Sequence, residues 1–503
     1  MKKRHSLIKM SGGACLALFS LIAVSCAQDG FTDETFGSSV HNTTLVSPEL
    51  TQKSFSTVTM SDGSEKVKVT WDVVDGAGGY DVTVHNVDDP ENPVVVFDDI
   101  VDGCTALFPK TDDTKYSVSV RTIGNVKLNN KDAEEATLFA YSTMIDATII
   151  PNGSDIAEFI NANVTSSENE LAFELEAGGE YTLNDVANFK NNKYTLRGNK
   201  VDHPIVKVGD KGSIWTGAGL KVKWIDFDCT DMAVTTTSNV GLLCLDKASY
   251  DEPGIYENCK SDVLGYKDAG ANQNTLVLED PVIMSDCVVK NLPMALFWAN
   301  NGTSWAMKDL RVTGCLVQLN NGKSSKALIS FEDEKSTGGY LMMTLRNNTF
   351  LNIADNSSAF TIRLKSGSNA VPKKLFGNAY EKSGRTTIEN NTWIKCMSGK
   401  AFGNQMVSNG VMTFSMNGNI FYDTYQVYKA IGNCTKDINQ EKNTIYGITK
   451  SVDSSDKNYS TEEDPDFEGP FLQELDLTKP NGGINLKPRG VISSTIGDPR
   501  WRE

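Results

Sequence analysis

Leu345-Arg-Asn347-Asn348-Thr-Phe350 is one of six short stretches that share a single frame, and this frame decides the fold. The frame is an apolar residue, a variable one, usually Asp, Gly or Asn, then Cys or Asn, a variable residue and a second apolar residue. The other copies are Met284-Ser-Asp286-Cys287-Val-Val289, Val312-Thr-Gly314-Cys315-Leu-Val317, Ile388-Glu-Asn390-Asn391-Thr-Trp393, Met416-Asn-Gly418-Asn419-Ile-Phe421 and the less faithful Gln440-Glu-Lys442-Asn443-Thr-Ile445.

Each position of the frame predicts a local structure. The third position holds residues that tolerate a left-handed backbone, so a strand turns a tight corner there. The fourth position points inward, where an asparagine side chain can bond to the same residue one coil above and below. A cysteine at this position acts as a small buried hydrophobe and needs no disulfide partner, although an exported protein permits disulfides.

The spacing of the copies predicts a parallel β-helix. Successive fourth positions are 28, 33, 43, 28 and 24 residues apart, which fits coils of about two dozen residues with loops of varying size. Val222–Cys229 reads as an earlier, degenerate coil, so the stack is expected from about Leu171 to Ile445. Ser451–Asp466 is predicted to be a polar excursion before a C-terminal tail, and Ser154–Asn163 a short helix that covers the open end of the stack.

The preceding region predicts a different β architecture. Val67–Trp71, Tyr80–Val84 and Tyr116–Arg121 alternate with period two and are separated by turn residues. The early tryptophan, the tyrosine that opens the next strand and the late Tyr116-x-Val-x-Val pattern resemble a fibronectin type III module, whose sandwich packs such residues between its sheets. Such modules are usually spacers.

The first residues predict export. A basic start, Met1–His5, leads into an apolar run from Ala14 to Val24 that is too short to span a bilayer, and then to Ser25-Cys26. Ala23 and Ser25 before Cys26 resemble a bacterial lipobox, which implies a lipidated Cys26 as the mature N-terminus. The alternative is an ordinary cleaved signal with a chance cysteine.

These features together with the closing Ile496-Gly-Asp-Pro-Arg-Trp501 resemble Bacteroidetes surface lipoproteins of domain-of-unknown-function families in polysaccharide utilisation loci. The resemblance implies a right-handed, pectate-lyase-like β-helix, an outer-membrane lipid anchor facing the cell exterior, and neighbouring glycan-import proteins as partners. The predicted fold class is all-β, with a signal peptide at 1–25, a tether at 26–53, a fibronectin type III-like sandwich at 54–147 and the parallel β-helix with its capping helix and tail at 148–503.

Binding of an extended polysaccharide, pectin-like or otherwise uronate-containing, is the first functional hypothesis. Stacked coils repeat side chains about every 4.8 Å along a face, which suits a ligand of several sugar units. Trp298, Trp305 and Tyr340 are candidates for stacking on sugar rings, with burial in the core as the alternative for each. The net charge of -16 argues against nucleic acid as a partner.

A polysaccharide lyase is the second hypothesis. Such an enzyme removes the proton α to a uronate carboxylate with an Arg or Lys base while a cation neutralises the carboxylate. Arg363 and Lys365 are expected to face outward with Arg346 nearby on the preceding coil, and Glu332, Asp333 and Glu334 could bind calcium. The alternative is that these charges form the solvated face of a strand and its loop, with no cofactor.

A glycoside hydrolase is the third hypothesis and ranks below the lyase. Hydrolases of this kind use clustered carboxylates, and the best local pair is Asp226 and Asp228, two apart and therefore on one face of a strand. Only three histidines follow the signal peptide, so histidine-based catalysis and multi-histidine metal sites are disfavoured.

Overall fold

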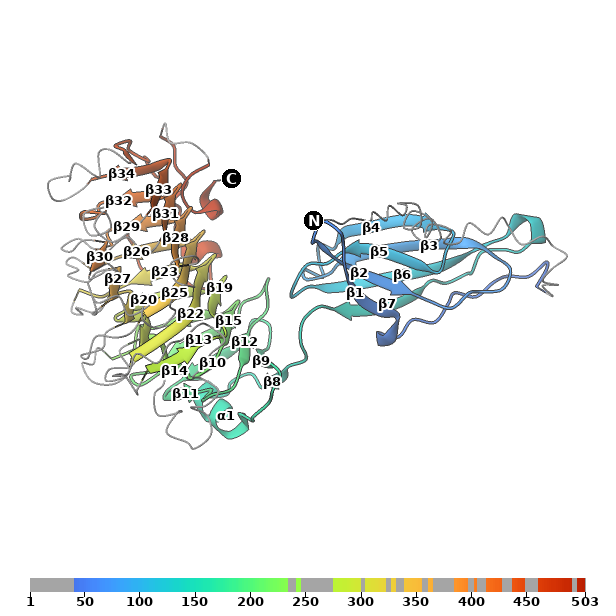
Figure 1. Ribbon diagram of the computed structural model, residues 1–503, viewed down its shortest axis with the longest axis horizontal. Coiled ribbons are helices and arrows are strands. Elements are labelled where there is room, and N and C mark those ends of the chain that lie inside the picture. The colour runs from blue at the N-terminus through green and yellow to red at the C-terminus, as the bar shows by residue number, and fades with distance from the viewer. Residues whose placement is uncertain are drawn as a thin grey trace, which may run out of the picture. The chain divides into compact units, whose positions relative to one another are not determined.

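The structure is a computed structural model that describes residues 40–233, 241–245, 275–299, 304–322, 327–331, 339–354, 361–364, 384–396, 402–404, 413–427, 437–447, 460–490 and 495–502. The chain divides into two compact units, residues 1–144 and 145–503 (Figure 1). Within the described ranges, no helix is both long enough and apolar enough to cross a membrane.

The first unit is a β-sandwich of two antiparallel sheets, as the alternating pattern predicts. One sheet has the order β1 (Phe55–Thr59), β2 (Glu65–Thr70), β5 (Thr105–Pro109). The other has the order β4 (Val94–Val101), β3 (Ala77–Asn86), β6 (Lys115–Gly124), β7 (Thr137–Ser142). Trp71, Tyr80 and Tyr116 are buried in one core between the sheets, so the residues that carried the resemblance are the core residues.

Residues 40–53 belong to the sandwich, which corrects the predicted tether over this stretch. Leu45 and Leu50 are each 6 % exposed. The backbone N–H of Leu45 donates to the carbonyl of Lys131 at 3.1 Å, and that of Lys131 donates to the carbonyl of Thr43 at 2.8 Å. The sandwich therefore starts before residue 54, because these apolar side chains and backbone groups find partners on it. Residues 26–39 lie outside the described residues.

The second unit is a parallel β-helix whose coils pass in turn through three stacked sheets (Figure 1). Sheet 1 contains β8 (Thr148–Ile150), β9 (Leu171–Leu175), β12 (Tyr194–Arg197), β15 (Leu220–Lys223), β18 (Thr275–Leu278), β19 (Val282–Ser285), β22 (Ser304–Thr313), β25 (Gly339–Arg346), β28 (Arg385–Glu389), β31 (Thr413–Asn417) and β33 (Asp437–Glu441).

Sheet 2 contains β10 (Glu180–Leu183), β13 (Ile205–Val208), β16 (Asp226–Asp228), β20 (Val288–Leu292), β23 (Leu316–Leu319), β26 (Thr349–Asn352), β29 (Thr392–Ile394), β32 (Ile420–Tyr422), β34 (Asn443–Tyr446) and β35 (Ser460–Thr461). Sheet 3 contains β11 (Val186–Asn188), β14 (Ser213–Thr216), β17 (Gly241–Leu245), β21 (Ala295–Ala299), β24 (Ile329–Phe331), β27 (Ile362–Leu364) and β30 (Gly403–Asn404). Inward-facing residues from the strands of all three sheets fill a single long core.

A short helix closes one end of this core, as predicted. Helix α1 spans Ile156–Asn163, and its N-cap Asp155 accepts a hydrogen bond from the backbone N–H of Glu158 at 3.0 Å. Ile156 and Ile160 are buried against the first coil. The helix is therefore the lid over apolar side chains that no further coil covers.

The corner between sheets 1 and 2 has the predicted left-handed backbone. All six third positions of the frame have a positive φ, namely Asp286 (51°), Gly314 (66°), Asn347 (57°), Asn390 (54°), Gly418 (64°) and Lys442 (55°). This conformation is costly for most residues other than Gly, Asn and Asp. The composition of the third position is thus explained by the corner.

The fourth positions form a buried asparagine ladder, which confirms the predicted inward stack. The side-chain N–H groups of Asn348, Asn391 and Asn419 donate to the side-chain oxygen of the next asparagine at 2.9, 3.0 and 3.0 Å, ending on Asn443. The same oxygens also accept from backbone N–H groups; Oδ1 of Asn391, for example, accepts from the backbone N–H of Asn348 at 3.0 Å. Each side chain also donates to a carbonyl at the end of the sheet 1 strand one coil away.

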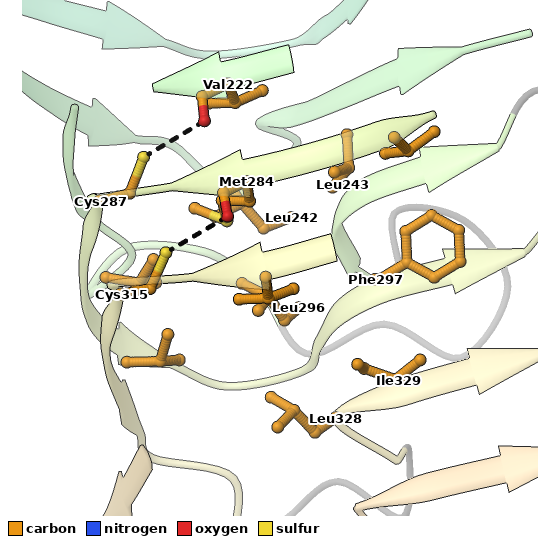
Figure 2. Close-up of a cluster of buried hydrophobic side chains, with 14 of the residues drawn as sticks. Val222, Leu242, Leu243, Met284, Cys287, Leu296, Phe297, Cys315, Leu328 and Ile329 are labelled. Carbon is orange, nitrogen blue, oxygen red and sulfur yellow. Dashed lines mark hydrogen bonds between the residues drawn. The ribbon is translucent and has the colours of Figure 1, made fainter. Parts of the chain in front are cut away.

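Cysteines continue this ladder toward the first coils without forming disulfides. The thiols of Cys287 and Cys315 belong to the main core and lie one above the other on adjacent coils. Each donates to a backbone carbonyl, of Val222 and Met284 respectively, at 3.7 Å (Figure 2). Both are free and buried, as predicted. Burial raises the pKa of the Cys396 thiol to about 12 and raises the pKa of the Cys287 thiol well above its usual range.

We expect the substitution Asn391→Ala to lower the free energy of unfolding by at least about 3 kcal/mol, since it removes buried hydrogen bonds that the Asn391 side chain makes to the backbone N–H of Asn348, the carbonyl of Leu345 and Oδ1 of Asn419. The measurement is urea unfolding followed by far-ultraviolet circular dichroism. The matched control is Asn417→Ala, a half-buried residue whose side chain donates to Ser415, for which we expect a loss below about 1 kcal/mol. Equal losses in the two variants would contradict a special role of the ladder.

We expect Cys287 and Cys396 to resist alkylation by iodoacetamide at pH 8 in the folded protein, because their raised pKa values keep the reactive thiolate scarce and their burial blocks access. Both should react fully in guanidinium chloride without a reducing agent. Peptide mass spectrometry measures the labelling. Labelling of the native protein, or its absence after unfolding, would contradict the buried free-thiol assignment.

Candidate functional site

The two described arginines of the predicted lyase site lie on different sheets. Arg346 ends β25 of sheet 1, whereas Arg363 lies in β27 of sheet 3. The whole of β26 and two corners of the coil separate them. The prediction that Arg346 lies near Arg363 was therefore wrong, because β25 and β27 follow each other around the coil and do not lie side by side.

Arg346 is held by a carboxylate. Its guanidinium donates to Oε2 of Glu389 at 2.7 Å across the register pair of β25 and β28. The Arg346 side chain is 48 % exposed, so the pair lies at the surface. The guanidinium of Arg346 is thus engaged as a hydrogen-bond donor to Glu389.

The three predicted aromatic residues lie in strands, and Trp298 and Tyr340 are buried. Trp298 lies in β21 and is 2 % exposed, and Tyr340 lies in β25 and is fully buried, with its hydroxyl 2.8 Å from that of Thr386. Tyr340 is a core residue, so the prediction that it stacks on a sugar was wrong. Trp298 is buried outside the main core, in a cluster of its own. Trp305 lies in β22.

The remaining residues of the predicted lipid, lyase and calcium sites cannot be placed. Cys26, Lys365, Glu332, Asp333 and Glu334 lie outside the described residues. Among the residues that are described, no three His, Cys, Asp or Glu side chains are grouped so that they could hold a metal ion.

The predicted hydrolase carboxylates each have a partner. Oδ1 of Asp226 lies 2.7 Å from Nδ1 of His203, and Oδ2 of Asp228 lies 3.3 Å from Nζ of Lys290. Lys290 also contacts Glu474 at 2.9 Å. Asp226 is therefore engaged in a hydrogen bond and Asp228 in an ion pair, both partly buried, at the early coils of sheet 2.

The outer face of sheet 2 is covered by residues 461–490 and 495–502, which we call the C-terminal segment. Its apolar side chains pack on the outward residues of four neighbouring strands. The sheet contributes Leu316, Leu351, Ile394 and Ile420, and the segment contributes Phe467, Leu475, Ile484, Leu486, Ile496 and Trp501. The predicted tail is thus a packed layer, and sheet 2 is closed to ligands across these strands.

The closing Ile496–Trp501 motif is the anchor of this segment. Thr349 donates to the Asp498 carboxylate at 2.7 Å and accepts from Nε1 of Trp501 at 2.7 Å. The backbone N–H of Asp498 donates to Thr392 at 3.0 Å, and Arg500 donates to the carbonyl of Gly314 at 2.6 Å. Burial raises the pKa of Asp498, which is 3 % exposed.

The outer face of sheet 1 is polar over several consecutive coils. Inward residues such as Met343, Ile388 and Met416 are buried, so their strand neighbours point outward. The outward residues form three register rows: Thr313, Arg346, Glu389 and Asn417; Arg311, Thr344, Thr387 and Ser415; and Asp309, Met342, Arg385 and Thr413. Hydroxyl, amide and charged groups thus recur side by side along one face.

Arg385 differs from the other arginines of this face. Arg311 contacts Asp309 at 2.5 Å and Arg346 contacts Glu389 at 2.7 Å. Arg385 is exposed, and no acidic side chain among the described residues pairs with it. It therefore offers two parallel N–H donors to a carboxylate from outside the protein.

The outer face of sheet 3 carries a row of a different character. Register pairs align Trp215, Cys244, Trp298, Ser330, Arg363 and Asn404 on successive coils. The alternate residues Leu243, Phe297 and Ile329 belong to the main core (Figure 2). The row is apolar at Cys244 and Trp298, which are buried, and polar toward Arg363, which is half-buried.

Sequence reasoning missed Arg385, Ser330 and the hydroxyl row of Thr344, Thr387 and Ser415. The frame contained a usable signal for the sheet 1 residues. Side chains alternate along the strand that leads into the frame, so the residues one and three positions before its first apolar residue face outward. No comparable frame marks sheet 3, so Ser330 carried no signal of its own.

Comparison with known families finds two matches. Residues 1–188 match the model of a domain of unknown function, DUF4992, and residues 179–353 match that of another, DUF4957. The first match covers the sandwich and the first strands of the β-helix, and the second covers most of its earlier coils. No curated protein matches the chain. The expected likeness to domain-of-unknown-function families is confirmed.

We expect the substitution Trp501→Ala to loosen the C-terminal segment, because it deletes a side chain that is 5 % exposed together with its hydrogen bond to Thr349. Trp to Ala changes in a core cost about 3–5 kcal/mol. The measurement is the rate at which trypsin cleaves the segment from the folded protein. Lys479→Ala, an exposed residue paired with Asp476, is the control and should leave the rate unchanged; equal rates for wild type and Trp501→Ala would contradict the anchoring role.

Proposed function

We propose that this protein is a lipid-anchored surface protein that binds an extended, carboxylate-bearing polysaccharide on the outer face of sheet 1. Cys26 would carry the lipid anchor in the outer membrane, with the chain facing the cell exterior as part of a glycan-utilisation system. The residue that carries the proposal is Arg385, an exposed arginine without an acidic partner among the described residues, in the middle of a polar face.

The neighbours of Arg385 fit a sugar chain. The neighbouring register row, two residues further along each strand, consists of the hydroxyl residues Thr344, Thr387 and Ser415, of which Thr387 is 9 % exposed and the other two are half-buried. The row beyond it consists of Arg346, Glu389 and Asn417. Hydroxyl and amide groups both donate and accept, as sugar hydroxyls do. Strands about 4.8 Å apart repeat these groups along the helix axis, so a polymer lying along the axis meets several of them.

The geometry of the face also favours a uronate over a neutral sugar. Arg385 provides a bidentate donor for a carboxylate. Arg346 is already paired with Glu389, so it could bind a ligand carboxylate only by leaving Glu389 without its partner, which costs free energy. Arg385 is thus the group that discriminates. Met342, half-buried beside it, supplies an apolar surface for the face of a sugar ring.

Binding is favoured over the lyase reaction by the separation of the arginines. Proton abstraction needs a base and a group that neutralises the carboxylate in one groove. Arg346 and Arg363 lie on different sheets, so the described residues do not assemble such a groove between them. Ultraviolet absorbance of unsaturated uronide ends, followed in the same incubations as binding, tests this ranking directly.

We expect the substitution Arg385→Ala to weaken binding of an acidic polysaccharide at least about tenfold, since a hydrogen bond to a charged group contributes about 1.5–3 kcal/mol. The measurement is retardation of the purified protein in native gels that contain polygalacturonate, alginate or a neutral glucan. The wild type should be retarded in a gel that contains an acidic polysaccharide. The retardation should disappear as salt is added, because salt screens the exposed contact between Arg385 and the carboxylate.

Lys207→Ala is the matched control, since Lys207 is an exposed cation on sheet 2 that pairs with Glu180. This variant should migrate as the wild type does in every gel. Undiminished retardation of Arg385→Ala, or retardation in the neutral glucan alone, would remove the sheet 1 face as the binding site.

A further inference from the structure

We propose that the β-sandwich holds a binding site for a small neutral saccharide, in a cleft between residues 49–54 and residues 70–72. The cleft has a volume of about 430 Å³ and is lined by Glu49, Thr51, Lys53, Ser54, Thr70, Trp71 and Asp72. Small-molecule sites in proteins usually measure about 300–1,000 Å³, so the cleft has room for a mono- or disaccharide. The site goes beyond the proposed polysaccharide surface, because it belongs to the first unit of the chain and selects a ligand of different charge.

Both walls of the cleft are anchored in the core of the sandwich. Leu50, within the first wall, and Trp71, in the second, are buried in the same core cluster. A hydrogen bond from Oγ1 of Thr70 to the carbonyl of Ser54, at 3.3 Å, joins the two walls. The cleft is therefore formed before a ligand arrives, which lowers the entropy cost of binding.

Unpaired charges of both signs line the cleft. Glu49, Lys53 and Asp72 are exposed, and within residues 40–233, all of which the structure describes, their side chains form no hydrogen bond or ion pair. A charged ligand meets a like charge here, since an acid faces two carboxylates and an amine faces the ammonium group. A neutral ligand avoids this repulsion and still gains from hydrogen bonds to ionised groups, which are stronger than those between neutral groups.

Hydroxyl groups in the same cleft favour a ligand that carries hydroxyl groups itself. Oγ of Ser54 accepts from the backbone N–H of Thr51 at 3.1 Å and can still donate, and Oγ1 of Thr70 donates to Ser54 and can still accept. Sugar hydroxyls both donate and accept, so they match the carboxylates, the ammonium group and the hydroxyls together. An amino acid, as a zwitterion, matches the charges alone.

Trp71 supplies an apolar contact and a means to detect binding. Part of its side chain lines the cleft, while most of it is buried in the core. Sugar rings place their apolar faces on aromatic side chains of this kind. Residues 1–144 contain no other tryptophan, so a ligand in the cleft changes the surroundings of this one.

Tryptophan fluorescence of the purified protein, titrated with the neutral disaccharides cellobiose, maltose and lactose, tests the proposal. We expect a saturable change with at least one of them, and we expect Trp71→Phe to remove it. Digalacturonate, putrescine and alanine, which represent an acid, an amine and a zwitterion, should cause no change that depends on Trp71.

Exposed side chains provide variants that should keep the fold. Lys53→Ala and Asp72→Ala should each weaken binding of the disaccharide at least about threefold, the effect of one lost hydrogen bond that water partly replaces. Lys127→Ala and Glu134→Ala are the matched controls, since both residues are exposed on the sandwich and do not line the cleft. These two variants should bind as the wild type does, and circular dichroism checks the folding of all four.

Three outcomes would overturn the site. They are a flat titration with all three disaccharides, an equal Trp71-dependent response to a charged compound, and unchanged affinity in both Lys53→Ala and Asp72→Ala. Arg385→Ala separates this proposal from the polysaccharide surface. It should keep the fluorescence response, whereas its loss would assign the sugar to sheet 1; Lys53→Ala should in turn keep the retardation by acidic polysaccharide.

Discussion

The structure depends on the hydrogen bonds that asparagine side chains make along the corner between sheets 1 and 2. A sharp corner in every coil turns backbone N–H and C=O groups away from the sheet ladders, and buried groups of this kind must be paired. Asn348, Asn391, Asn419 and Asn443 supply these partners from inside the coil. The left-handed residue before each of them turns the chain so that the side chain can point inward. Because each asparagine bonds to the next, the register of one coil fixes the register of its neighbours.

Fixed register has different consequences on the three faces. It aligns every outward residue with its counterparts on the adjacent coils, so each face is a set of rows whose composition decides its use. On sheet 2 the rows are apolar at Leu316, Leu351 and Ile394, and the C-terminal segment covers them. On sheet 1 the rows are mainly polar, with Arg346 and Arg385 exposed and Asp309 and Thr387 buried. On sheet 3 a row passes from a buried aromatic residue to a half-buried cationic one.

The sequence predicted the coils well because their corner imposes two coupled requirements at adjacent positions, a left-handed backbone and an inward hydrogen-bonding or small side chain. It placed Arg346 directly before a corner at Asn347 but could not assign Arg363 to a sheet, since the segments between strands vary in length and no frame marks the second corner of a coil. Trp298 and Tyr340 were misjudged for the same reason: outside the frame, no pattern tells an inward from an outward position. The C-terminal segment was read as a tail because Phe467, Leu475 and Ile484 follow no period. Their burial is set by the rows of sheet 2, which are far away in sequence.

The exposed position of Arg385 decides how the sheet 1 face can bind. Water and salt screen its attraction for a carboxylate, so binding there must gain its strength from several contacts along a polymer. An open face of this kind discriminates between polymers by the repeat of their charges. The repeating coil can carry such a face because the asparagine ladder fixes the register from inside the coil and leaves the outward positions free to differ.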